Sequence, residues 1–190
     1  SHWSDSVDGF MNFCIYLPDS HIDEQRGKPY PVLYCLGGLT SNNENWSIKS
    51  GFGPYAKKHR IAVVFPDSSP RNTNIPGVAE DWELGDSASF YVNATSEKYK
   101  KHFQMYTYIT GNYLELFRAI SQFAELTVDH WVHMGGHGAL IAALKTGKYR
   151  SVSAFAPISN PIVTERWGQK LLNNTSLTGK AKDHNMTQLK

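Results

Sequence analysis

The chain has 190 residues, a formal net charge of +2, and a composition that is 41% hydrophobic and 19% charged. These values are typical of one globular domain with a continuous core, and they exclude a disordered or fibrous chain. Acidic and basic residues are scattered, which argues against a nucleic-acid-binding surface, and the longest apolar runs are too short for a membrane span. We therefore expect a single domain over residues 1–190 with neither nucleic acid nor membrane as partner.

The amino-terminal residues and the two cysteines indicate where the protein works. The segment 1–5 carries neither the basic nor the apolar region of a secretion signal, so we expect a cytoplasmic protein. Cys14 and Cys35 each lie in an apolar run and are predicted to be buried thiols, not a disulfide. The chain begins without methionine, which suggests a piece of a longer protein.

The first half of the chain alternates apolar segments with turn-forming ones. Apolar runs at 10–17, 31–36 and 61–66 predict strands, and the last two have the pattern of strands buried on both faces. Apolar residues at helical spacing predict a helix within 45–59, which its glycines and proline interrupt or delay. Residues 67–103 are polar, rich in aromatics and weakly periodic, so we expect a long loop that walls a pocket.

The second half continues this alternation. Apolar residues at helical spacing predict one long helix over 104–126. A glycine-rich turn then leads into a second helix over 134–145, and residues 151–157 predict a further strand. Helices that alternate with apolar strands are typical of the α/β class, in which a parallel sheet is covered on both faces.

The chemistry is expected where the strands end, because ligands of open α/β sheets bind beyond the carboxyl ends of the strands. Here these ends are 36–40, 67–70 and 156–158. The most informative segment is 133–138, His-Met-Gly-Gly-His-Gly, since a strand that ends on a glycine-rich turn into a helix is the setting of a GxSxG nucleophile elbow.

Residues 134–140 resemble the segment that follows the catalytic serine of S-formylglutathione hydrolases, the esterase D family. The resemblance runs in order through much of the chain, at 11–18, 31–40, 65–71, 90–95, 104–106 and 148–158. It implies an α/β-hydrolase three-layer sandwich with a mostly parallel central sheet, incomplete at both ends. It also implies a serine esterase, without cofactor or metal, that hydrolyses the small thioester S-formylglutathione to formate and glutathione in formaldehyde detoxification. Family members commonly dimerise, so a homodimer is conceivable.

Three departures from the family limit that expectation. His133 stands at the position of the serine nucleophile, and Trp131 replaces the first motif glycine. Histidine does not simply replace serine, because acyl transfer needs a nucleophile activated by an oriented base. Only residues 127–133 separate the predicted long helix from the glycine turn, so the family's nucleophile strand is largely missing unless Trp131 and Val132 rebuild a short one. The family's triad acid and histidine lie beyond the segment that corresponds to Lys190.

The backbone groups of the family's site carry over more readily. The resemblance assigns the two oxyanion-hole N–H groups to Met134 and, in the glycine loop, Leu39. In the family each such donor stabilises the tetrahedral intermediate by about 3 kcal/mol. Ser41 stands where the family has a cysteine next to this loop.

Four further polar residues are given structural roles. His137 lies among glycines and is expected to be a packed residue, and no ligand spacing supports a metal site. His184 resembles part of an exposed helix start and not a triad histidine. Asp67 and Asp81 lie in turns, where a carboxylate usually accepts loop hydrogen bonds.

Three hypotheses on function follow. The chain is a thioester hydrolase by lineage whose activity is lost or depends on further sequence. Alternatively, it is a non-catalytic binding or dimerisation partner that keeps the fold. The third hypothesis is a defective gene product without a stable fold.

Overall fold

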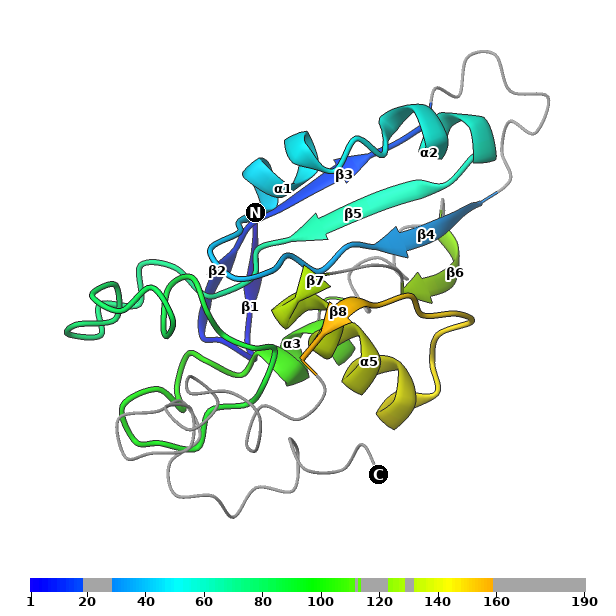
Figure 1. The fold of residues 1–190 in the computed structure, drawn as a ribbon. Helices are drawn as coiled ribbons and strands as arrows, with labels where there is room; N and C mark the ends of the chain where they lie inside the picture. Colours follow the sequence, from blue (N-terminus) through cyan, green and yellow to red (C-terminus); the bar gives the residue numbers. More distant parts are fainter. Residues whose placement is uncertain (19–28, 112, 114–122, 129–131, 159–190) are drawn as a thin grey trace.

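The protein is built around a four-stranded sheet in the order β3-β5-β4-β6 (Figure 1). The computed structural model describes residues 1–18, 29–111, 113, 123–128 and 132–158, and for 123–128 and 132–133 it describes the backbone alone. The four strands are β3 (Phe13–Tyr16), β4 (Tyr30–Tyr34), β5 (Ala62–Pro66) and β6 (Phe123–Val128). Strand β4 runs parallel to β5 and β6, and β3 runs antiparallel to β5.

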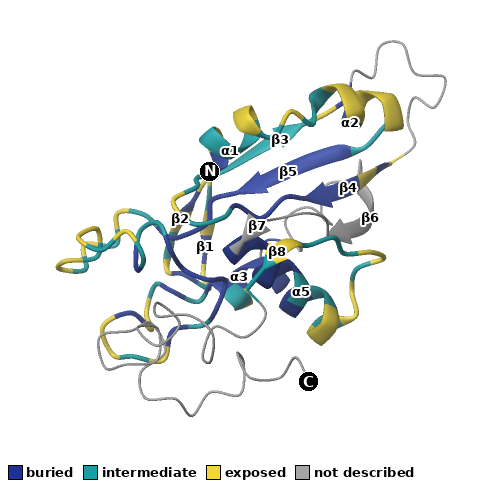
Figure 2. Cartoon of the chain, in the orientation of Figure 1, coloured by how far each residue is buried: buried dark blue, intermediate teal, exposed yellow. Residues whose placement is uncertain are grey.

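The two strands predicted to be buried on both faces are the central ones. All five residues of β5 are buried, and in β4 only Pro31 is exposed (Figure 2). Proline lacks a backbone N–H group, so it belongs near the start of a strand. In Figure 1, α1 and α2 lie to one side of this sheet and α3 and α5 to the other.

The predicted strand over 10–17 is in fact two strands. Residues Gly9–Met11 form β2, which pairs antiparallel with β1 (His2–Ser4), whereas β3 begins at Phe13 and pairs with β5. Asn12 lies between them, and its carbonyl accepts a hydrogen bond from the backbone N–H of Asp67 at 2.9 Å. The chain therefore changes partner strand at Asn12 without leaving its backbone oxygen unpaired.

The predicted helix within 45–59 is also divided. Helix α1 covers Asn43–Lys49, and Asn42 caps it through a reciprocal pair of hydrogen bonds with Asn45. Helix α2 covers Gly53–His59. Gly51 separates the two helices because its φ of 65° lies in the left-handed region, which a continuous helix does not allow.

The long helix predicted over 104–126 is wrong for residues 123–126, while its residues 112 and 114–122 lie outside the described part of the chain. Helix α3 covers only Met105–Thr110, and residues 123–128 form β6, whose register on β4 pairs Val32 with Leu126. The sequence Phe-Ala-Glu-Leu-Thr-Val has the aromatic and β-branched residues that suit a strand. Its pairing supplies hydrogen-bond partners to the edge of β4, which outweighs a helical periodicity that the segment also shows.

A second, two-stranded parallel sheet joins β7 (Val132–His133) to β8 (Phe155–Pro157). Helix α5 (Met134–Thr146) begins immediately after β7, as the glycine-rich turn predicts. Strand β8 is shorter than the predicted 151–157. The segment 67–103 contains no named helix or strand, and its aromatic residues Phe90, Tyr91, Tyr99 and Phe103 enter the core.

Two further predictions concern the cysteines and the membrane. Cys14 and Cys35 are both free thiols; Cys35 is buried and Cys14 is half-buried beside Asn43. In the part of the chain that the structure describes, no helix combines the length and the apolar character that crossing a membrane requires.

Candidate active site

The corner between β7 and α5 is where the sequence places the site. Strand β7 ends at His133, and α5 begins at Met134, so the backbone makes the strand-to-helix turn of a nucleophile elbow. In the parallel register His133 lies opposite Pro157 of β8. Val132 and His133 therefore rebuild a short strand, as the sequence allowed, while Trp131 lies outside the described residues.

The elbow strand does not pair with β4. That position belongs to β6, and β7 pairs with β8 in a separate sheet. In the family one strand both completes the main sheet and leads into the elbow. In this chain two separate segments take these two positions. One segment completes the main sheet beside β4, and another, two residues long, leads into α5.

The glycine loop, residues 35–41, extends β4 toward the candidate site. Its first residue, Cys35, donates its backbone N–H to Val64 of β5 at 2.8 Å, which continues the sheet. Thr40 has a φ of 64° and donates its N–H to the carbonyl of Ser87 at 3.0 Å. Leu39, one of the two predicted oxyanion-hole residues, is half-buried against the core. The structure therefore fixes this loop through backbone hydrogen bonds at both ends.

Tyr91 connects the glycine loop to α5. Its hydroxyl donates a hydrogen bond to the carbonyl of Gly37 at 2.9 Å, and its ring packs on Gly138. A Cβ atom at position 138 would lie 2.6 Å from Tyr91 Cδ2, so only glycine fits there. The neighbouring Phe90 donates its backbone N–H to Met134 Sδ at 3.2 Å. Both aromatic residues have φ near 50°, a strained region for side chains of this size (Phe90 53°, Tyr91 51°).

This connection is the part of the site that sequence reasoning missed. Leu39 and Met134 lie on the two segments that Tyr91 and Phe90 join, so their relative position depends on this aromatic pair. Burial raises the pKa of the Tyr91 hydroxyl well above its ordinary value, so the group stays protonated and remains a donor. No motif predicts that a residue so far away in sequence would hold the two segments together.

Asp67 serves as a loop partner, as predicted. It is buried at the end of β5 and forms an ion pair with Arg71 at 2.9 Å. Burial raises the pKa of its carboxyl group, while the hydrogen bonds from Arg71 act in the opposite direction. Arg71 Nη2 also donates to the carbonyl of Ser41 at 3.0 Å, which ties this loop to the glycine loop. A carboxylate engaged by Arg71 holds structure and does not serve as a general base here.

Three serine hydroxyls near these loops are also committed to backbone oxygens. Ser68 donates to Ser41, Ser69 donates to Gly85 at 2.7 Å, and Ser89 donates to Ser68 at 2.5 Å. A nucleophilic serine needs a base that accepts its proton, and a carbonyl oxygen cannot take it up. These hydroxyls therefore stabilise the loops.

Of the remaining polar residues singled out in the sequence, those that the structure describes have the structural roles expected of them. His137 is buried in α5, its Nδ1 lies 2.9 Å from the carbonyl oxygen of Ile158, and burial lowers its pKa. Asp81 accepts a hydrogen bond from the backbone N–H of Glu83 at 2.9 Å. His184 lies outside the described residues. Within the described ranges no three His, Cys, Asp or Glu side chains gather as a metal site would require.

Comparison with known proteins decides the family. A family model described as "Putative esterase" matches residues 4–188. The chain belongs to this esterase family. Within it, the chain is 46% identical over 162 residues to S-formylglutathione hydrolase of Mus musculus, and this alignment covers 84% of this chain and 56% of that protein. It is 44% identical over 176 residues to S-formylglutathione hydrolase of Arabidopsis thaliana, and this alignment covers 91% of this chain and 60% of that protein.

Solved structures of esterases confirm the fold. The chain is similar to an S-formylglutathione hydrolase from Agrobacterium tumefaciens with a TM-score of 0.82 and 33% identity, over 92% of this chain and 62% of that one. A serine hydrolase of Staphylococcus aureus, FphF, matches with a TM-score of 0.66 at 20% identity. That match covers 97% of this chain and 67% of FphF. The predicted α/β-hydrolase fold is thus confirmed in incomplete form, and the chain spans 56% to 62% of the length of the S-formylglutathione hydrolases named above.

Proposed function

We propose that this chain is an S-formylglutathione hydrolase-like member of the esterase family that keeps the backbone of the oxyanion site but does not turn over thioesters as a 190-residue chain. The observation that carries this proposal is the position of His133 at the end of β7, one residue before α5. That corner is where a nucleophile elbow presents its serine.

The chemistry of imidazole supports the loss of activity. Histidine can accept an acyl group, but catalysis also requires a second group that removes its proton and is itself held in orientation. Asp67 does not fill that role, because Arg71 engages it. His137 does not fill it either, because it is buried with Nδ1 on the carbonyl of Ile158.

The backbone donors of Leu39 and Met134 support a retained affinity for the carbonyl of a small ester or thioester. Both belong to segments that Tyr91 and Phe90 hold in place. An oxyanion site made of backbone N–H groups survives side-chain substitution, since no side chain supplies its donors. By lineage, the ligand is S-formylglutathione and the setting is formaldehyde catabolism in the cytoplasm.

A direct assay tests this proposal. Purified chain is mixed separately with S-formylglutathione and p-nitrophenyl acetate, and product release is compared with His133→Ala and His133→Ser variants. We expect all three proteins to match the buffer background, since a serine without its base is not activated. Hydrolysis by the parent chain that disappears in His133→Ala would overturn the proposal and establish a histidine nucleophile.

An alternative function is a non-catalytic dimerisation partner. Among the described strands β8 pairs only with β7, and it presents Phe155 with 48% of its surface exposed. An exposed large apolar side chain can belong to a surface on which a second chain packs. Sedimentation velocity of the parent and of Phe155→Lys tests this alternative, which predicts a dimer that the charged variant abolishes. A monomeric parent excludes it, and the absence of cooperative unfolding would support a defective product.

A further inference from the structure

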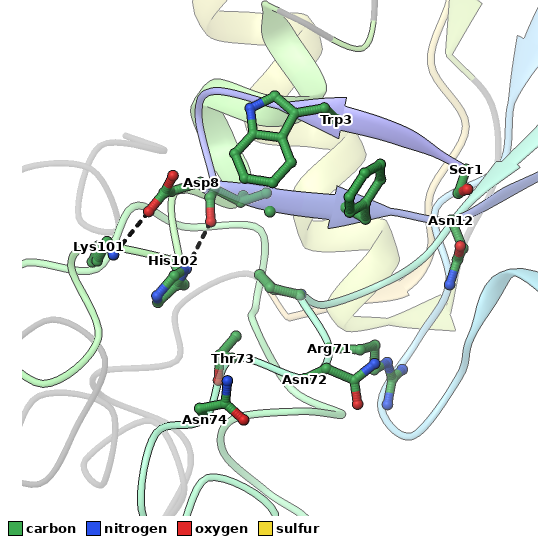
Figure 3. Close-up of a pocket in the computed structure, with 14 residues that line it drawn as sticks. Ser1, Trp3, Asp8, Asn12, Arg71, Asn72, Thr73, Asn74, Lys101 and His102 are labelled. Atoms are coloured by element: carbon green, nitrogen blue, oxygen red, sulfur yellow. Dashed lines mark hydrogen bonds and ion pairs between the residues drawn. The ribbon is translucent and has the colours of Figure 1, made fainter.

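A cleft of about 600 Å³ lies between the β1–β2 hairpin and the loop 70–74 (Figure 3). Lys101 and His102 close one end of it, and Asn12 contributes from the other side. Its volume falls within the range of about 300 to 1,000 Å³ that is typical of small-ligand sites. His133, Met134 and Leu39 do not line this cleft, so it is distinct from the β7–α5 corner.

One wall of the cleft is aromatic and exposed. Trp3 and Phe10 face each other across the β1–β2 ladder, with ring centroids 5.3 Å apart and planes at 84°. Their exposed fractions are 51% and 67%, which is unusual for side chains of this size. The indole N–H of Trp3 donates to Asp5 Oδ1 at 3.0 Å, so the ring orientation is held before any ligand arrives.

Apart from Arg71, which Asp67 holds, the residues of the opposite wall are uncharged and mostly polar. Asn72, Thr73 and Asn74 lie across the cleft from Trp3 in Figure 3. Asn72 and Asn74 adopt left-handed backbone conformations with φ of 56° and 57°, and each amide offers both a donor and an acceptor. Thr73 Oγ1 is buried with no hydrogen-bond partner in the described part of the chain.

The charged residues of the cleft are already compensated. Lys101 Nζ forms an ion pair with Asp8 at 2.9 Å, and Arg71 is held by Asp67. A phosphate or carboxylate ligand would meet cations whose charge a neighbouring carboxylate already balances. The cleft therefore suits a neutral ligand that has both apolar and hydrogen-bonding surfaces.

We propose that this cleft binds a neutral saccharide. A pyranose ring has a C–H face that packs on an aromatic ring such as Trp3, and a rim of hydroxyls that the amides of Asn72 and Asn74 can bind. A nucleobase fits less well, because the rings of Trp3 and Phe10 stand nearly perpendicular and cannot clamp a flat base between parallel faces.

Titration of the full chain with neutral trisaccharides tests this assignment. Maltotriose, cellotriose, xylotriose and mannotriose are added separately while ¹H–¹⁵N NMR spectra record the indole signal of Trp3 and the amide signals of Asn72 and Asn74. At least one sugar is expected to bind with a Kd on the order of 1 mM and to shift these three signals together. Adenosine and inorganic phosphate are titrated in parallel as competing ligand classes.

Matched variants separate binding from folding. Trp3→Ala is expected to weaken saccharide binding about tenfold or more, while Trp3→Tyr restores most of it because an aromatic ring remains. Trp82→Ala, at a tryptophan that is 62% exposed and outside the cleft, is the control and should bind as the parent does. Asn72→Gly removes the amide but tolerates the left-handed backbone, so a loss of affinity in this variant reports the hydrogen bond.

The outcomes that overturn the proposal are equally defined. If none of the four sugars shifts the cleft signals, the assignment fails, and it also fails if adenosine or phosphate binds in their place. Equal losses of affinity in Trp3→Ala and Trp82→Ala would contradict it as well. None of these results depends on turnover at the β7–α5 corner.

Discussion

The hydroxyl of Tyr91 donates a hydrogen bond at 2.9 Å to the carbonyl oxygen of Gly37, and both groups are buried. This bond links the glycine loop to a residue whose ring rests on Gly138 of α5. The two segments that carry Leu39 and Met134 are thereby held through one aromatic side chain. Because the bond is buried, removing either partner leaves an unpaired polar group in the core.

Tyr91→Phe removes the donor and keeps the ring. The carbonyl of Gly37 then loses this partner in a buried position, so the free energy of unfolding should fall by about 1 to 3 kcal/mol. Urea denaturation measures this change. Tyr55→Phe on α2 is the matched control, since that tyrosine is 66% exposed and its variant should unfold as the parent does. Equal stability of Tyr91→Phe and parent would show that the bond contributes nothing.

Gly138→Ala tests the close packing of Tyr91 on α5. The added Cβ would lie 2.6 Å from Tyr91 Cδ2, which forces a shift of a buried ring and should cost about 1 to 3 kcal/mol of stability. Gly53→Ala in α2 is the control, because the nearest atom there is Tyr16 Cε2 at 3.5 Å, an ordinary contact. Thermal unfolding compares the two variants. A stable Gly138→Ala protein would mean that Tyr91 does not pack as described.

His137 predicts a pH dependence of stability. Burial lowers its pKa in the folded protein below the ordinary value of about 6.5, so the unfolded chain binds the proton more tightly. Stability should therefore decrease as the pH falls below about 6.5, through the window between the unfolded and folded pKa values. Burial also lowers the pKa of His2, which contributes in the same direction.

The variant His137→Gln isolates this contribution. Its urea midpoint should decline less than that of the parent between about pH 7 and pH 5, because one titrating group is gone. Measurements near pH 8, where histidine is neutral in both states, give the pH-independent effect of the substitution. A parent and a variant with parallel pH profiles would contradict the assignment of the low pKa to His137.

The pairing of β6 with β4 predicts slow hydrogen exchange. Backbone amides of residues 123–128 and of Val32 to Tyr34 should be protected together, since they form one ladder. The loop 70–74 serves as an internal reference for fast exchange. Mass spectrometry of peptic fragments measures both. Rapid exchange over 123–128 with continued protection of the β4 amides would show that another segment covers this edge.

Much of the central sheet and the elbow helix follow from the sequence, because their signals are local. The continuous apolar runs of β4 and β5 indicate strands buried on both faces, and the glycine turn at Gly135 indicates where α5 starts. The sequence predicts a helix for residues 123–126, the first part of β6, because their apolar spacing fits both the helical and the strand period. The strand is favoured because it pairs with the otherwise open edge of β4. The sequence of 123–128 alone does not reveal that this edge is available.

In the candidate site, too, only the features that depend on local sequence could be predicted. The positions of His133, Met134 and Leu39 could be predicted, since each belongs to a motif that is contiguous in the chain. The contacts of Tyr91 could not be predicted, because they join it to Gly37, 54 residues earlier in the chain, and to Gly138, 47 residues later. The turn position of Asp67 predicts a loop hydrogen-bond partner, as the structure shows, but nothing in that turn identifies Arg71 as the cation that binds it.

The loss of catalysis at the β7–α5 corner is tested most directly by asking whether this chain takes up an acyl group there. The chain is incubated with p-nitrophenyl acetate, quenched in acid, and mapped by mass spectrometry of its peptides. We predict that the peptide containing His133 carries no acetyl group beyond the level found in the His133→Ala control digest. An acetyl adduct on His133 that forms and then hydrolyses with time would contradict the proposed loss of activity and identify this residue as a working nucleophile.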